Sequence, residues 1–174
     1  EVPSMQHPLD PLNDTEIAGA ASIVREFGGL SPQAWFETIA LEEPSKQALA
    51  AGDPPRLAYV CCYDPASNQT WAGIAGLQAG RLLKWKHQKG MQARIGIDEF
   101  VIGGDTAKAD PRFIAACARR GITDMSTVLV EPWAAGNFGI KAEEGRRIAV
   151  GHCWVRNAAG DNPYARPIAN LHPV

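Results

Sequence analysis

The sequence predicts an α+β protein made of two units, each a helix packed on an antiparallel β-sheet, with the second unit lacking its last strand. Three observations support this fold class. An amphipathic helical pattern opens the chain, four β-patterned segments follow it, and helical and then strand patterns recur from Ile97 onward. One helix covering one face of a sheet is a stable two-layer arrangement, and the expected units are residues 1–95 and 96–174.

The first predicted helix covers residues 13–29. Asn13 can cap its N-terminus, and Glu16 stands three residues later, where a capping box places an acidic partner. Apolar residues repeat at helical spacing before the pair Gly28-Gly29, namely Ile17, Ala20, Ala21, Val24 and Phe27. The pattern predicts an amphipathic helix with one apolar stripe.

The predicted strands of the first unit are residues 34–41, 56–64, 68–77 and 81–88. The turn signals DPAS and QAG stand immediately before the last two of them. In the last segment Leu83 and Trp85 alternate with Lys84 and Lys86, which is typical of a half-buried strand. These four consecutive strands are expected to form one antiparallel sheet under the first helix.

The second unit is expected to begin with a helix near Ile97, which the pair Gly103-Gly104 would interrupt. A second helix is predicted over residues 110–121, where Asp110 can cap and Pro111 suits the first turn. Three strands are expected to follow, at residues 126–132, 146–157 and 161–174. If both units share one architecture, a fourth strand would lie beyond Val174. No sequence repeat relates the two units, so this parallel rests on element order alone.

The composition is that of an ordinary globular protein. Hydrophobic residues make up 45% of the chain and charged residues 21%, and the formal net charge of −2 lacks the basic excess of a nucleic-acid-binding protein. No apolar run reaches the roughly 18 residues of a membrane helix, and residues 1–12 lack a signal-peptide pattern. We therefore expect a cytoplasmic protein without nucleic-acid or membrane partners. Because the chain begins with Glu1, we also expect it to be processed or cut from a longer one.

Motifs for catalysis or metal binding are missing from the sequence. The four cysteines have no CxxC spacing and are expected to be buried free thiols in a reducing compartment; they are Cys61, Cys62, Cys117 and Cys153. The four histidines are scattered without HxH or HExxH spacing, at positions 7, 87, 152 and 172. No nucleophile elbow or phosphate-binding loop occurs either. The sequence thus predicts no catalytic and no metal-ligating residue in this chain.

A weak motif suggests a different class of protein. QTWAG at residues 69–73 and Pro132-Trp133 resemble the QxVxG hairpin and the Pro-Trp loop of cystatin-type protease inhibitors. However, Trp71 replaces the small apolar centre of the motif, and the Pro-Trp pair lies in the other unit. A stand-alone cystatin-like binding or protease-inhibitor module is therefore the alternative hypothesis.

Several longer strings resemble the N-terminal region of copper-containing primary-amine oxidases. They occur in the order of that family, and the resemblance extends from His7 to Val174. The strings are HPLDPL (7–12), DPRFIAACARRGITD (110–124), VLVEPWAAGNFG (128–139), EEGRRIAVGHCWVR (143–156) and DNPYARPIANLHPV (161–174).

The resemblance implies two small α+β domains of cystatin-like topology that precede a large catalytic domain. The family's complete enzymes are homodimers that oxidise primary amines to aldehydes and release ammonia and hydrogen peroxide. They use copper held by three histidines and a topaquinone made from the tyrosine of an Asn-Tyr-Asp/Glu motif, with an aspartate as the base. This chain has neither that motif nor a His-x-His pair. We therefore expect a non-catalytic N-terminal fragment that binds no cofactor itself and is inactive alone.

The same resemblance points to four residues as part of the wall of the substrate channel. Phe100, Pro132, Trp133 and Tyr164 fall where channel-lining residues lie in related enzymes. Aromatic rings with a polar tip suit an amine that carries an apolar tail. The alternative for Phe100 and Trp133 is a place in the core of the second unit. Tyr164 is the stronger candidate, because prolines at positions 163 and 167 restrict the backbone around it.

Overall fold

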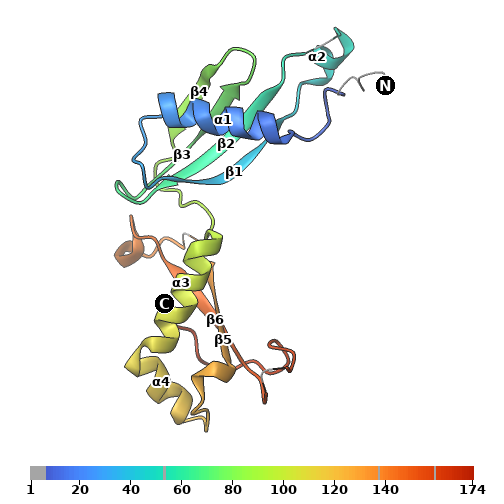
Figure 1. Cartoon of the computed structure of the whole chain (residues 1–174). Helices are drawn as coiled ribbons and strands as arrows, with labels where there is room; N and C mark the ends of the chain where they lie inside the picture. Colours follow the sequence, from blue (N-terminus) through green and yellow to red (C-terminus); the bar gives the residue numbers. More distant parts are fainter. Residues whose placement is uncertain (1–6, 53, 137, 159) are drawn as a thin grey trace. The chain divides into compact units, whose positions relative to one another are not determined.

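The computed structural model describes residues 7–52, 54–136, 138–158 and 160–174. It divides into two compact units that separate between Ala93 and Arg94. Each unit combines helices with antiparallel strands, which confirms the α+β class (Figure 1). Within the described residues, no helix is both long enough and apolar enough to cross a membrane.

Helix α1 (Asp14–Phe27) begins with the predicted capping box. The Asn13 side chain accepts a hydrogen bond from the Glu16 backbone N–H, and the Glu16 carboxylate accepts one from the Asn13 N–H. The buried face of the helix consists of Ala20, Ile23 and Val24. Ile17 and Phe27, which were expected on this stripe, are 38% and 52% exposed. Ile17 lies at the border of the buried face and Phe27 is the last helical residue, so the contact with the sheet is narrower than predicted.

The four predicted strands of unit 1 are confirmed and form one antiparallel sheet in the order β1-β2-β3-β4. Their bounds are β1 (Trp35–Glu42), β2 (Leu57–Asp64), β3 (Gln69–Gly76) and β4 (Arg81–His87). A short helix, α2 (Lys46–Ala50), joins β1 to β2 and was not predicted. It is only five residues long and has no buried residue, so no apolar periodicity marks it in the sequence.

Helix α1 covers one face of this sheet (Figure 1), and the core of unit 1 lies between them. Alternate residues of β2 point toward the helix, and Ala58, Val60 and Cys62 are at most 1% exposed. Trp85 of β4 packs against the same core, as expected, and its indole N–H donates a 3.0 Å hydrogen bond to the carbonyl oxygen of Gly28. This contact fixes the end of α1 on the sheet.

Unit 2 places two helices against a two-stranded antiparallel sheet. The elements are α3 (Ile97–Ala109), α4 (Pro111–Ala118), β5 (Val128–Ala134) and β6 (Ala149–Val155), with single turns of 3-10 helix at Met125–Thr127 and Lys141–Glu143. Helix α3 continues through Gly103-Gly104, where an interruption was expected. Gly104 is needed where α3 approaches β5, because a Cβ atom there would lie 2.7 Å from the carbonyl oxygen of Val130. The glycine therefore serves close packing rather than a break.

The closing segment, residues 161–174, was predicted to be a strand, and this prediction was wrong. It forms only an isolated bridge to β6, between Trp154 and Pro167. The segment still follows β6, since the Ile168 N–H donates to the carbonyl oxygen of Cys153 and the Gly151 N–H donates to that of Pro173. Its prolines cannot donate ladder hydrogen bonds, and Asn170 has a positive φ of 54°. These two properties prevent a regular strand.

In both units, a glutamate that caps the start of the first helix is also bound by an arginine from elsewhere in the same unit. In unit 1, the helix-capping carboxylate of Glu16 also accepts two hydrogen bonds from the guanidinium of Arg56, at 2.5 and 3.0 Å. In unit 2, Glu99 accepts the Gly96 backbone N–H and is bound in the same bidentate way by Arg147, at 2.5 and 2.6 Å. In both units the pairing ties the helix start to a segment at least 40 residues further along the chain.

Candidate functional site

The sheet of unit 2 has one face turned toward its helices and one turned away. Val128 and Val130 of β5 and Cys153 of β6 pack with Phe113 of α4 in the core. Strand alternation therefore puts the intervening residues on the opposite face. We call this the outer face; it carries Leu129, Glu131 and Trp133 from β5 and Val150, His152 and Trp154 from β6.

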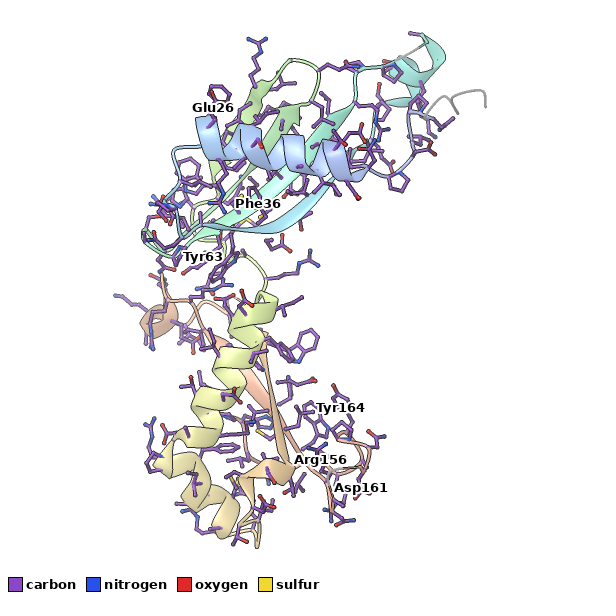
Figure 2. All side chains as sticks on the ribbon, in the orientation of Figure 1. Glu26, Phe36, Tyr63, Arg156, Asp161 and Tyr164 are labelled. Carbon is purple, nitrogen blue, oxygen red and sulfur yellow. The ribbon has the colours of Figure 1, made fainter. Side chains whose placement is uncertain are left out.

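Tyr164 lies over the outer face. Its hydroxyl donates a 2.5 Å hydrogen bond to Oε1 of Glu131, and its ring meets the ring of Trp154 edge-on, with centroids 5.3 Å apart. The Asn162 side chain accepts a 2.9 Å hydrogen bond from the backbone N–H of Tyr164. This bond stabilises the turn that places the Tyr164 ring over the outer face. Figure 2 shows Tyr164 on the side of β5 and β6 that faces away from α4. The side chain is anchored yet 51% exposed, and is thus available to a ligand.

Glu131 is the functional candidate that sequence reasoning missed. It is only 8% exposed, although it carries a carboxylate. Its hydrogen bond and its negative charge raise the pKa of Tyr164, because the ionised phenol would lose the bond and face a like charge. The signal in the sequence was an acidic residue inside the apolar strand VLVEPW. A buried carboxylate needs a partner, but its partner stands 33 positions away and no local pattern reveals it.

Phe100 and Trp133 contact each other. Their rings meet edge-on with centroids 6.2 Å apart, which joins α3 to the end of β5. Trp133 is 56% exposed, while Phe100 is half-buried. Neither belongs to the buried core cluster of unit 2.

Pro132 faces the opposite way from its two neighbours in β5. It is buried beside Gly103 of α3 and lines a cavity of about 610 Å³ between the helices and the sheet. The closing segment also lines this cavity through its last four residues. The structure thus brings Phe100 to Trp133 and places Tyr164 on the same sheet face as Trp133, but it puts Pro132 on the helix side.

The fold also brings together two histidines that the sequence separates. His152 stands opposite Glu131 in the strand register, and its ring lies 5.9 Å from that of His172 in the closing segment. The ring centroid of Trp154 lies 6.1 Å from that of His152. Across the part of the chain that the structure describes, no group of three or more His, Cys, Asp or Glu residues is arranged to hold a metal ion.

The four cysteines are buried and form no disulfide bond. Burial raises the pKa of Cys62 to about 12 and that of Cys153 to about 11. The thiolate, which is the reactive form, is therefore scarce at neutral pH. Cys62 belongs to the core of unit 1, and Cys117 and Cys153 belong to that of unit 2.

The QTWAG string, which suggested an inhibitor hairpin, lies inside a strand. It occupies the beginning of β3, which pairs with β2 on one side and β4 on the other. A segment paired on both edges cannot insert into a protease cleft as a free loop would.

These features define a two-domain α+β protein whose second domain presents an aromatic face around one buried carboxylate. Residues 7–88 match the family model described as the copper amine oxidase N2 domain, and residues 98–174 match the copper amine oxidase N3 domain. The chain therefore belongs to the copper amine oxidase family and comprises these two domains.

Individual relatives agree with this assignment. A primary amine oxidase of Arthrobacter sp. (strain P1) is 39% identical over 169 residues, which are 96% of this chain and 26% of the relative. A histamine oxidase of Arthrobacter globiformis is 31% identical over 95% of this chain and 25% of the relative. A solved copper-containing benzylamine oxidase of Hansenula polymorpha shares the fold, with a TM-score of 0.71 at 19% identity over 94% of this chain and 27% of its own. The chain spans about a quarter of the length of these proteins.

Proposed function

We propose that this chain is a non-catalytic part of a copper amine oxidase, in which unit 2 forms part of the wall of the route that primary amines take to the catalytic centre. The parent reaction converts a primary amine, oxygen and water to an aldehyde, ammonia and hydrogen peroxide. The observation that carries the proposal is the outer face, where the half-exposed Tyr164 donates a hydrogen bond to the buried Glu131 carboxylate and the exposed Trp133 lies two residues further along the same face of β5. A catalytic domain of the same enzyme and a second copy of the enzyme are its proposed partners.

The outer face has the chemistry to attract and orient an amine. A primary amine is largely protonated at neutral pH, and an ammonium over an exposed aromatic face gains about 0.5–1 kcal/mol. The rings of Trp133 and Tyr164 are both more than half exposed, so each offers such a surface. Their edges and faces also provide apolar area for the tail of the amine. Contacts this weak can guide a substrate and discriminate between tails without trapping it.

The residues of this chain do not fit the cofactors of the parent reaction. The sequence contains no His-x-His pair and no Asn-Tyr-Asp or Asn-Tyr-Glu motif. In the described ranges, His152 and His172 come together without a third ligand. Copper and the quinone would be held by another part of the enzyme. The proposed role of this chain is limited to binding, orienting and admitting the amine.

Substitution of Tyr164 in the full-length enzyme tests the proposal. The Tyr164→Ala variant should change the ratio of kcat/KM for benzylamine to kcat/KM for methylamine by about twofold to tenfold, because an aromatic contact contributes about 0.5–1.5 kcal/mol. The matched control is Tyr59→Ala, since Tyr59 of β2 is 37% exposed in unit 1 and should leave the ratio unchanged. An unchanged ratio in Tyr164→Ala would remove Tyr164 from the channel wall.

A further inference from the structure

Glu131 is a buried carboxylate on the outer face of unit 2. It is 8% exposed, and no Lys, Arg or His among the described residues forms an ion pair with it. A buried carboxylate costs several kcal/mol unless hydrogen bonds compensate for lost hydration. The hydrogen bond that it accepts comes from the Tyr164 hydroxyl. Such a costly arrangement needs an explanation beyond the packing of β5.

We propose that Glu131 is a positioning residue for Tyr164, and that through this hydrogen bond it determines which amines the channel wall admits. The inference rests on the proposed function, in which Tyr164 contacts the substrate. Glu131 itself meets the hydroxyl end of Tyr164 and acts only through that residue.

Three contacts hold Tyr164, and they act on different parts of the residue. Asn162 fixes the backbone N–H, and Trp154 supports one edge of the ring at 5.3 Å. Among the described residues, only the bond to Glu131 restrains the hydroxyl end. Because about half of the residue faces solvent, a ring without this restraint can turn to other staggered rotamers. Loss of the Glu131 carboxylate should therefore change the position of the Tyr164 ring in the channel wall without changing the fold of β5.

The negative charge of Glu131 has a second effect on the same ring. A phenol that donates to a carboxylate is polarised, so its oxygen becomes a better acceptor for another donor. An approaching ammonium is such a donor. The structure thus assigns to the Glu131–Tyr164 pair a preference for protonated primary amines whose tail can lie against an aromatic ring.

A double-mutant cycle in the full-length enzyme tests the inference through kcat/KM. Glu131→Met keeps the length of the side chain and removes the acceptor, while Tyr164→Phe removes the donor. Each should change the benzylamine-to-methylamine ratio of kcat/KM by about threefold to tenfold, and the double variant should change it no further, because both substitutions break one contact. Glu131→Gln retains an acceptor without the charge and should give an intermediate change. Additive effects would contradict a role through Tyr164.

A second readout follows the contact itself, independently of turnover. With tyrosine labelled by ¹³C in this 174-residue chain, NMR titration reports each of its three tyrosines. Glu131→Gln should lower the pKa of Tyr164 toward its ordinary value and leave the pKa of Tyr59, in the other unit, unchanged. If Glu131→Met does not fold, the pKa of Tyr164 in Glu131→Gln tests the inference instead. An unchanged pKa of Tyr164 in that variant overturns the inference. If Tyr164→Ala changes the benzylamine-to-methylamine ratio of kcat/KM while the Glu131 variants do not, the result would support Tyr164 as part of the channel wall. The same result would contradict the positioning role of Glu131.

Discussion

Replacing Phe113 by alanine is expected to lower the free energy of unfolding of unit 2 by about 3–5 kcal/mol. Phe113 of α4 is 5% exposed and, among the described residues, is the only aromatic residue in the core cluster of this unit. It packs there with Cys117, Val128, Val130 and Cys153. Alanine removes the ring and leaves a cavity that the rigid β5–β6 pair cannot fill. Denaturant unfolding followed by circular dichroism measures the loss.

Ile114 provides the matched control for this prediction. It is the next residue of α4 and is 40% exposed. Ile114→Ala should change the free energy of unfolding by less than about 1 kcal/mol, since little area is lost and alanine favours the helix. Equal losses in Phe113→Ala and Ile114→Ala would mean that α4 does not pack against the sheet through the face described here.

Removing Arg147 is expected to cost about 2–3 kcal/mol, because the Glu99 carboxylate then loses two charge-assisted hydrogen bonds in a largely buried place. The side chains of Arg147 and Glu99 are only 12% and 21% exposed, and Arg147 also donates to the carbonyl oxygen of Arg94. Arg147→Lys keeps the charge but cannot form the bidentate pair, so it should recover only part of the loss. Chemical unfolding of Arg147→Ala and Arg147→Lys measures both values.

The pair Arg112–Asp110 is the control for this ion pair. It also has a short contact, of 2.6 Å, but the Arg112 side chain is 91% exposed. Exposed ion pairs contribute about 0–1 kcal/mol, so Arg112→Ala should cost far less than Arg147→Ala. If the two substitutions cost the same, burial of the Glu99–Arg147 pair would not explain its contribution.

Local patterns were enough to predict most elements of the fold. The Asn13–Glu16 capping box, the strands of unit 1 and the start of α4 at Pro111 each depend on residues a few positions apart. The closing segment was assigned wrongly because its apolar residues suit a strand while its prolines and Asn170 do not. Helix α3 was expected to break at its glycines because their use, close approach to β5, is a tertiary contact.

The candidate site was harder to predict than the fold, for the same physical reason. The resemblance directed attention to Tyr164, but the Glu131–Tyr164 bond joins residues 33 positions apart and no spacing rule encodes it. The contact between His152 and His172 is equally nonlocal. The resemblance pointed to both Pro132 and Trp133 as channel-lining residues, yet strand alternation turns them to opposite faces.

Chemical modification at position 164 tests the channel wall most directly. The Tyr164→Cys variant of the full-length enzyme, labelled with a bulky maleimide, should lose most of its turnover of benzylamine, and an amine substrate should slow the labelling. The cysteines of this chain are buried and add little background, and Glu26→Cys on the exposed side of α1 (Figure 2) is the labelled control. If labelled Tyr164→Cys turns over bulky and small amines as labelled Glu26→Cys does, Tyr164 does not line the route of the substrate.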